Sequence, residues 1–475
     1  MPPQRRILRE VLAMATTKVL IRAPQAPERR AAARMTGRYL VTIEPDAHRE
    51  ISTKLNRVGF KAAPPLPRVA TSAKPLPDGS HLTLRNVGVA LVDPKPDQED
   101  ALHRFAAQER AVIALEPERI VRAVEVDRAS DYLRGWRDAV DALAGKLLEE
   151  QRPLAPVPSE AAVPGATWGL AATKVINTRL SGANIKVAIL DTGFDLSHPD
   201  FAQRQIVTKN FVGDQQPFHD GVGHGTHCTG TATGPLHPAS VQRYGIAFEA
   251  LIFSGRVLDD TGRGGDFNIL EGIDWAIEQG CDIVSLSLGA PWQPGDPAFS
   301  PAYESAAQRA LAAGCLLVVA AGNEADDPQF VGAVGTPGNS PSVLTVAAVD
   351  RNLATAPFSD RVQPDAPGVK GPDLAGPGVD VFSSWLVSSG RYNTISGTSM
   401  ATPHVAGIAA LFAQANPDIR GQALKDMILN HCMALPNGAA RKGEIGRGLV
   451  QAPINSQSDM RADRRRQRRV GRANK

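Results

Sequence analysis

Cysteine is scarce in this sequence: the 475-residue chain has only Cys228, Cys281, Cys315 and Cys432. Four cysteines, none of them in a C-x-x-C pair, exclude a disulfide framework for a chain of this length. We therefore expect these residues to be mostly reduced, buried thiols.

Long apolar runs are also missing. No stretch of about 18 or more apolar residues occurs, which excludes a transmembrane segment on sequence grounds. Residues 1–24 contain basic side chains but no uninterrupted apolar core followed by small residues, so they do not resemble a secretory signal. On this basis we expect a cytoplasmic location, with secretion as the alternative.

Positive charge is concentrated at one end of the chain. The net charge is +3, but residues 461–475 (RADRRRQRRVGRANK) hold eight Lys/Arg and one Asp. The rest of the chain is therefore net acidic. We predict that residues 453–475 form a basic, disordered and solvated tail. The alternative is an electrostatic tether to nucleic acid or anionic lipid, without sequence-specific recognition.

The length exceeds that of one ordinary core, so two or more domains are expected. Residues 1–35 are rich in Arg and Ala and are predicted to be a flexible arm. Residues 36–128 are predicted to form a small domain, and residues 129–166 an amphipathic helix followed by a Pro-rich linker. Residues 167–452 form the larger domain.

The small domain alternates strand-like and helix-like segments. Strands are predicted within 38–45, 80–93 and 112–124, where 80–93 reads as a strand or hairpin, and helices within 47–59 and 96–109. The order β-α-β-β-α-β, or close to it, is typical of a ferredoxin-like α+β sandwich.

The larger domain shows short continuous apolar runs separated by helical segments. Strands that are apolar on both faces belong to a parallel sheet covered by helices, so we predict a doubly wound α/β fold with helices on both faces. The predicted strands are 185–190, 250–258, 282–288, 315–321 and 343–349, and the predicted helices are 266–280, 301–314, 399–415 and 419–432.

Polar residues stand where these strands end. Asp191 follows one strand directly, Asn323 follows another, and His224 lies in a Gly-rich turn. Together with Ser399 they would lie on one rim, because functional groups gather beyond the carboxyl ends of parallel strands. A serine needs an adjacent base, an imidazole needs a carboxylate to fix its tautomer, and an amide N–H can stabilise an oxyanion.

Taken singly, each of these residues has an ordinary structural explanation, such as a turn residue or a helix cap. A turn or cap role does not explain why all four residues occur together within long sequence motifs. The blocks VAILDTGFDLSHPD, GHGTHCTG, VVAAGNE and SGTSMATPHVAG resemble the signature blocks of the subtilisin-like serine proteases, in the same Asp, His, Ser order. The resemblance covers about residues 165–452. It implies a serine endopeptidase with a subtilisin-like fold, Asp191, His224 and Ser399 as the triad, and Asn323 as the oxyanion amide.

The resemblance also implies a substrate channel. SLSLG resembles the strand that pairs with substrate, and DDTGRGG resembles the opposite pairing edge. A glycine at the pocket floor implies that a large apolar or aromatic residue is accepted before the cut. The implied substrate-binding residues are Gly262, Gly264, Ser287, Leu288, Gly289, Ala321, Gly322 and Gly335.

No cofactor is implied for catalysis, and no metal ligand is assigned. Asp200 matches one position of the structural calcium site that subtilases often hold, but the loop 234–250 lacks the usual Asn-rich pattern. Structural calcium is therefore not supported by a clear site. Cys228, four residues after His224, resembles the thiol that lies beneath the catalytic histidine in one branch of the family; its alternative is a small buried hydrophobe.

Residues 38–126 resemble, more loosely, the pro-domain that inhibits subtilases from within the same chain. The resemblance implies an auto-inhibited precursor whose segment near Val124–Asp127 runs through the substrate channel. Polypeptide substrates and this N-terminal domain are the expected partners.

Three other classes remain as alternatives. A metal-binding module could use His219, His224, His227 and Cys228, although their spacing fits no standard pattern. An α/β-hydrolase esterase would need a G-x-S-x-G elbow, and here Ala401 replaces the second glycine. A catalytically inactive, binding-only subtilase finds no support, because all four active-site residue types are present.

Overall fold

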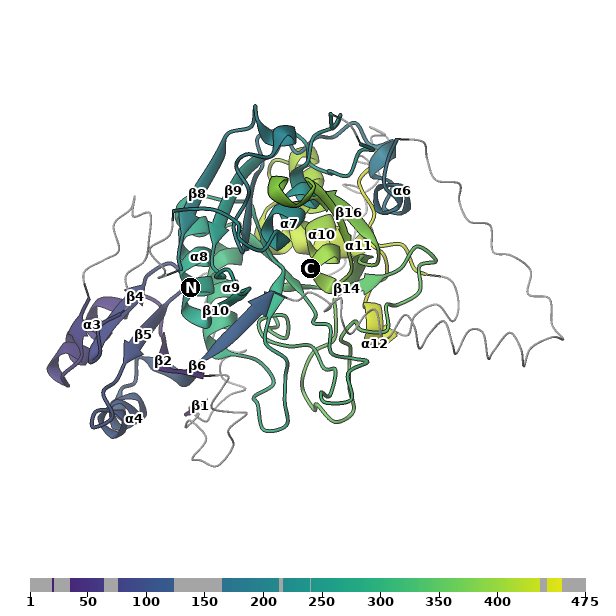
Figure 1. Cartoon of the computed structure of the whole chain (residues 1–475). Helices are drawn as coiled ribbons and strands as arrows, with labels where there is room; N and C mark the ends of the chain where they lie inside the picture. Colours follow the sequence, from purple (N-terminus) through teal and green to yellow (C-terminus); the bar gives the residue numbers. More distant parts are fainter. Residues whose placement is uncertain are drawn as a thin grey trace.

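The computed structural model describes residues 19–20, 35–63, 76–123, 165–212, 217–239, 241–435 and 442–454 (Figure 1). Most of the predicted arm 1–35, the predicted helix at 129–151, nearly all of the linker and the tail beyond residue 454 lie outside these described residues.

The N-terminal unit contains the predicted strands and helices in the predicted order, together with two short strands, β1 and β3, that were not predicted. Its sheet has the strand order β1-β6-β2-β5-β4-β3, in which β6, β2, β5 and β4 pair antiparallel. Helices α3 and α4 cover the sheet through a core that includes Val41, Ile51 and Leu102. The ferredoxin-like classification of this unit stays a prediction. The elements are β1 (Val19–Leu20), β2 (Met35–Ile43), α3 (His48–Arg57), β3 (Lys61–Ala62), β4 (Ser80–Leu84), β5 (Val89–Asp93), α4 (Glu99–Gln108) and β6 (Val112–Ala123).

The larger unit is built on a parallel sheet, as predicted. Its strand order is β15-β14-β13-β11-β7-β9-β8, so the first strand of the unit, β7, lies inside the sheet. Strands β11, β13, β14 and β15 extend in order to one edge, while β8 forms the other edge and β9 lies between β8 and β7. The five predicted strands are present, and β8 and β15 at the edges were not predicted. The bounds are β7 (Lys186–Asp191), β8 (Ile206–Asn210), β9 (Leu251–Arg256), β11 (Ile283–Leu286), β13 (Leu316–Ala320), β14 (Leu344–Val349) and β15 (Leu374–Pro377).

Helices cover both faces of this sheet because successive strand residues point to opposite sides. In β7, Val187 and Ile189 face the core shared with α7 (His224–Thr233), α10 (Thr398–Ala415) and α11 (Gly421–Asn430). Ala188 and Leu190 face the core shared with α8 (Asp266–Glu278) and α9 (Pro301–Ala312). This confirms the doubly wound α/β prediction.

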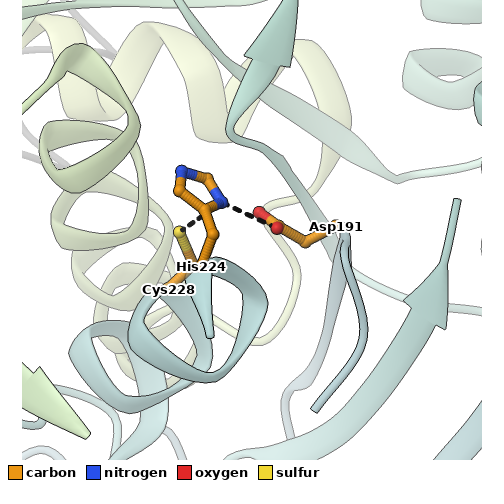
Figure 2. A group of neighbouring side chains, drawn as sticks. All are labelled: Asp191, His224 and Cys228. Atoms are coloured by element: carbon orange, nitrogen blue, oxygen red, sulfur yellow. Dashed lines mark hydrogen bonds and ion pairs between the residues drawn. The ribbon is translucent and has the colours of Figure 1, made fainter. Parts of the chain in front are cut away.

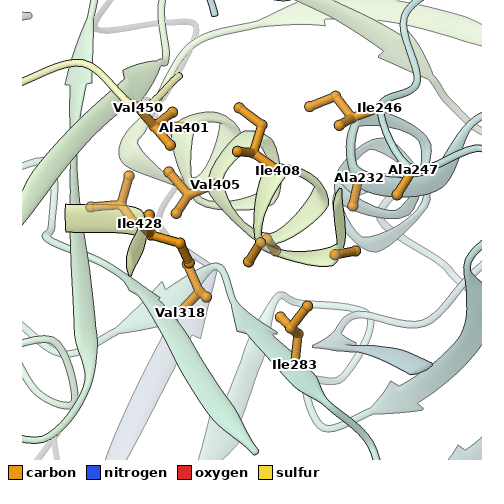
Figure 3. Close-up of a cluster of buried hydrophobic side chains, with 14 of the residues drawn as sticks. Ala232, Ile246, Ala247, Ile283, Val318, Ala401, Val405, Ile408, Ile428 and Val450 are labelled. Carbon is orange, nitrogen blue, oxygen red and sulfur yellow. The ribbon is translucent and has the colours of Figure 1, made fainter. Parts of the chain in front are cut away.

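Helix α10 is the central helix of its layer (Figure 3). Its residues from Thr398 to Ala413 are all buried, so every side of the helix packs against strands or neighbouring helices. A helix that is apolar on all sides is stable only inside a core. Among the described helices, none is long and apolar enough to cross a membrane. The remaining elements are α6 (Trp168–Ala172), η1 (Val175–Asn177), η2 (Pro199–Phe201), β10 (Arg263–Gly265), β12 (Leu288–Gly289), β16 (Val381–Ser384), η3 (Val387–Ser389), β17 (Tyr392–Ile395) and α12 (Lys442–Ile445).

Strand β6 links the two units. Most of it pairs with β2 in the N-terminal sheet, and Figure 1 shows that it extends from there to β10 of the larger unit. Its last residues pair antiparallel with β10 on one side and with β12 on the other. The end of the N-terminal unit therefore lies between two edges of the larger unit.

Candidate active site

A buried Asp–His pair forms at the carboxyl end of β7. Asp191 is the last residue of the strand and His224 is the first residue of α7. The His224 Nδ1 lies 2.7 Å from Asp191 Oδ1, and both side chains are essentially inaccessible to solvent (Figure 2). The first turn of α7 can lie this close to the backbone after β7 only with glycine at position 225, because a Cβ there would lie 2.2 Å from the Gly193 carbonyl oxygen.

The electrostatics of this pair favour a proton on the imidazole. Burial alone lowers the pKa of His224, but the Asp191 carboxylate and Cys228 beside it raise that pKa well above its usual value. Among the described residues, none forms a hydrogen bond with Nε2 of His224. The ring therefore has one nitrogen fixed by Asp191 and one nitrogen available for proton transfer.

Cys228 lies one helical turn below His224, as its sequence position implied. Its Sγ is 3.9 Å from His224 Nδ1 and donates a weak hydrogen bond to the carbonyl of Ser399 at 3.6 Å (Figure 2). Burial raises the pKa of Cys228 to about 11. The thiol is thus protonated near neutral pH and packs under the imidazole.

The structure does not bring together the four residues of the alternative metal site. His219 bonds through Nε2 to Asp260 at 3.0 Å, and His227 bonds through Nε2 to the carbonyl of Val381 at 2.9 Å. In the part of the chain that the structure describes, the one group of potential ligands is Asp191, His224 and Cys228. Two of these three already form the Asp–His pair.

Ser399 is the second residue of α10, which begins at Thr398 with Gly397 as its N-cap. It is therefore not a capping serine. Its Oγ donates to the carbonyl of Ser287 at 3.0 Å, and Ser287 Oγ donates to the carbonyl of Ser399 at 2.8 Å. Among the described contacts no hydrogen bond joins Ser399 to His224. Cys228 lies between them, because its thiol contacts both the His224 ring and the Ser399 carbonyl.

Asn323 is held by a residue that the sequence did not single out. Its Oδ1 accepts hydrogen bonds from the backbone N–H and the Oγ1 of Thr398, both at 2.9 Å. With the carbonyl end of the amide fixed in this way, the NH₂ end points away from Thr398. The position of Thr398, directly before Ser399, is the only signal of this role in the sequence.

The residues expected to bind substrate lie along β6 of the same chain. Leu288 and Gly289 form β12 opposite β6, and Gly264 lies opposite Val121. The carbonyl of Gly262 accepts a hydrogen bond from the Ala123 N–H at 2.9 Å. Both expected pairing edges are therefore occupied by one antiparallel strand.

The expected pocket is narrow. Gly289, Ala321, Gly322 and Gly335 line a cavity of about 10 Å³, and Glu324 joins them. A Cβ at Gly335 would lie 2.3 Å from the Ala290 carbonyl oxygen, so the glycine is needed for this opening. Acceptance of a large apolar residue requires the walls to move apart, and it stays a prediction.

Asp200, the candidate calcium ligand, serves another purpose. Its Oδ2 accepts hydrogen bonds from the Tyr244 hydroxyl at 2.6 Å and the Tyr392 hydroxyl at 3.1 Å. Burial, together with Asp200, raises the pKa of Tyr244, so this hydroxyl keeps its proton and donates it. Two phenolic donors directed at the carboxylate do not fit a calcium site at this position.

Comparisons with known proteins match the larger unit. The subtilase family model matches residues 182–459. An intracellular serine protease of Paenibacillus polymyxa is 37% identical over 283 residues, which is 57% of this chain and 79% of that protein. Subtilisin E of Bacillus subtilis is 34% identical over 278 residues, covering 58% of this chain and 67% of its own. A solved structure of a cold adapted subtilisin-like serine proteinase, 29% identical, gives a TM-score of 0.49 and covers 61% of this chain and 100% of that one.

Proposed function

Since this chain belongs to the subtilase family of serine proteases, we propose that it is an endopeptidase that uses Ser399, His224 and Asp191 as its catalytic triad. The observation that carries the proposal is the buried hydrogen bond of 2.7 Å between His224 Nδ1 and Asp191, next to a serine near the N-terminus of α10. Catalysis by this route needs no cofactor.

His224 acts as the general base. Its Nε2 accepts the proton of the Ser399 hydroxyl as the oxygen attacks the substrate carbonyl, and later returns that proton to the leaving amine. The hydroxyl donates to Ser287 in the structure, so it must rotate toward the imidazole when substrate binds. Asp191 keeps the other ring nitrogen protonated and stabilises the imidazolium, which is consistent with the raised pKa of His224.

Asn323 stabilises the charge that develops on the substrate carbonyl oxygen. Its NH₂ group and the backbone N–H of Ser399 are the proposed donors, because the Thr398 N–H already donates to Asn323 Oδ1 and the Met400 N–H donates to the Gly397 carbonyl. Thr398 orients the amide before the reaction begins, so this stabilisation needs no rearrangement in the transition state.

The N-terminal unit acts as an internal inhibitor in the proposed precursor. Support comes from β6, which pairs with both substrate-binding edges and places Val121 in the same buried cluster as Leu258 and Leu288. An extended segment in this position competes with substrate for the same main-chain hydrogen bonds. A high local concentration then keeps the enzyme latent while the two units remain joined.

The catalytic proposal is tested with Ser399→Ala in the full-length chain. Hydrolysis of casein or of a fluorogenic peptide should fall at least about a thousand-fold, because the triad acts as one unit. Ser396→Ala is the matched control: it removes a hydroxyl three residues earlier, which accepts a hydrogen bond from Asp380 N–H. Near-normal hydrolysis by Ser399→Ala, with the fold intact by circular dichroism, would sink the assignment.

The latency proposal is tested by loosening β6 without cutting the chain. Val121→Asp puts a charge into a fully buried position and should raise the peptidase activity of the full-length protein. Val58→Asp, at a residue that is 41% exposed on the same unit, should leave the activity as it was. If both variants match the parent chain in activity, β6 does not block the site.

A further inference from the structure

The last residues of β6 show how an extended polypeptide lies in the channel. Arg122 is opposite Gly289 of β12 on one side and opposite Arg263 of β10 on the other. Ala123 is opposite Leu288. A strand bound along both edges has a fixed register, so each position of a ligand can be assigned to a neighbour.

This register places Arg122 relative to the bond that is cut. Along an antiparallel pair, the position after Ala123 lies opposite Ser287, whose carbonyl accepts the Ser399 hydroxyl at 3.0 Å. A residue bound there has its carbonyl next to the proposed nucleophile. The Arg122 position is therefore the third residue before the cut, and the Val121 position is the fourth.

Arg122 meets one acidic side chain across the channel. Its Nη2 lies 3.7 Å from Oε1 of Glu324, and the Arg122 side chain is 50% exposed whereas that of Glu324 is 14% exposed. Alternate residues of a strand share a face, so the third and the first residue before the cut both point toward the pocket that Glu324 lines. Glu324 thus lines the pocket for the first residue before the cut and also lies near the third residue before the cut.

Glu324 is held in place from two directions. Its Oε2 accepts a hydrogen bond from the Asn323 N–H at 2.9 Å, and its own N–H donates to Asp360 Oδ1 at 2.9 Å. This leaves Oε1 as the oxygen nearest Arg122. A carboxylate fixed in this way loses little conformational entropy when it binds a cation.

Asp360 lies beside Glu324 and accepts the hydrogen bond of its backbone N–H. Burial, together with the nearby Glu324 charge, raises the pKa of Asp360 well above its usual value. A buried carboxyl with a raised pKa favours its neutral form, so Asp360 adds little negative charge beside Glu324.

From these contacts we infer that the active site prefers a basic residue three positions before the cut, and that Glu324 determines this preference. The inference rests on the proposed function, because it assigns a substrate class to the same channel. Substrates of this class carry an aliphatic residue at the fourth position, Arg or Lys at the third and a small residue at the second, as Val121, Arg122 and Ala123 do.

One neighbour opposes this preference. Arg263 lies opposite Arg122 on β10, and like charges in that relation repel. Its side chain is exposed and can turn into water, where the repulsion is screened. Glu324 is more buried and fixed, so the attraction is the larger effect. Arg263→Ala should accordingly increase the preference for a basic residue.

The test compares two peptides on the full-length chain that carries Val121→Asp. Acetyl-Val-Arg-Ala-Val and acetyl-Val-Gln-Ala-Val, each with the same fluorogenic leaving group, differ in charge but little in length. At low salt kcat/KM should be about two- to five-fold higher for the Arg peptide, the range of a partly exposed ion pair. The ratio should fall toward one at high salt.

Glu324→Gln should bring the ratio to about one, while Glu278→Gln, the same change on α8, should preserve it. The inference is overturned if the chain with Val121→Asp alone gives a kcat/KM ratio near one for the two peptides, or if Glu324→Gln leaves a higher ratio unchanged.

A binding measurement separates this inference from the proposed function. In a chain that also carries Ser399→Ala, fluorescent forms of the two peptides should show the same ratio in Kd by anisotropy. If the Arg peptide binds more tightly but the chain that retains Ser399 hydrolyses neither peptide, the preference for a basic residue stands and the proposed catalytic role is rejected. Hydrolysis of both peptides at equal rates, with equal affinities, would reject the preference alone.

Discussion

Thr398 sets the direction of the Asn323 amide, and its contribution can be measured. Thr398→Val keeps the shape of the side chain but removes the hydroxyl that donates to Asn323 at 2.9 Å. The amide then loses one of its two anchors and spends less time in the productive orientation. We expect kcat to fall about ten-fold with KM nearly unchanged, because the oxyanion is stabilised mainly in the transition state.

Steady-state kinetics on one peptide substrate measures this effect. Thr231→Val is the control, since it removes an equally buried hydroxyl that donates to the His227 carbonyl in α7. An equal loss in both variants would point to a general effect on stability rather than to the amide.

The Cys228 thiol gives a second prediction for a single residue. A linear mercurial bound to Sγ, 3.9 Å from His224 Nδ1, should displace the imidazole and abolish activity. Because burial raises the pKa of Cys228 to about 11, very little thiolate exists at pH 7.5, so iodoacetamide should react slowly and leave the enzyme active. Cys228→Ala should be active and resistant to the mercurial. Inhibition of Cys228→Ala to the same extent would place the reactive thiol elsewhere.

Strand β6 carries a buried acid that makes the docking of the N-terminal unit sensitive to pH. Glu116 is 1% exposed and accepts a hydrogen bond from the Ser300 hydroxyl at the start of α9. Burial raises its pKa from 4.5 to about 7. A carboxyl whose folded-state pKa is raised stabilises the fold fully below about pH 4.5, and this contribution is lost as the pH rises to about 7.

Glu116→Gln mimics the protonated acid and should remove this dependence. At pH 4 the variant and the parent should have similar free energies of unfolding. Above pH 7 the variant should be the more stable, by at most about 3.5 kcal/mol, since one pKa unit corresponds to about 1.4 kcal/mol. Urea denaturation at several pH values measures this difference. Glu44→Gln, at an exposed position of the same unit, should change neither curve.

The elements differ in how far sequence alone predicted them. Strands β7, β9, β11, β13 and β14 are buried on both faces, so their continuous apolar runs were sufficient. The edge strand β8 is short and half-exposed, and β15 contains Gly376 and Pro377, so neither has a strand pattern. Helix α7 consists largely of Gly, Thr and His, which are poor helix formers, so its sequence did not predict a helix. Packing against α10 stabilises the helix in the folded chain.

The candidate site differs from the fold in this respect. The sequence motifs named Asp191, His224, Asn323 and Ser399, whose catalytic roles stay predictions. The contact between Glu324 and Asp360 joins residues separated by 36 positions, with no spacing that signals it. The roles of Thr398 and Arg122 likewise depend on distances that only the folded chain defines.

At the scale of the whole molecule, the larger unit followed from its sequence because strand pattern and motif order agree with each other. The contact between the two units did not follow from the strand pattern; only the resemblance to the inhibitory pro-domain predicted that the end of the N-terminal unit, near Val124–Asp127, lies in the channel. Composition marked a boundary in the region 152–166, but the contact that joins the units lies earlier, in β6. Contacts between sheet edges depend on register, which the alternation of residues in a single strand does not fix.

The shared strand β6 has a consequence for the response of the protein to heat. If β6 inhibits as proposed, melting of the N-terminal sheet withdraws the strand from the channel, because one continuous segment pairs with β2, β10 and β12. Activity of the full-length chain should then rise in a step at the melting temperature of the N-terminal unit, followed by circular dichroism in parallel. Ile51→Ala, which empties part of that unit's core, should move the step to lower temperature, and a step that stays in place would contradict the coupling. A side chain remote from the nucleophile would in that way set the temperature at which the protease switches on.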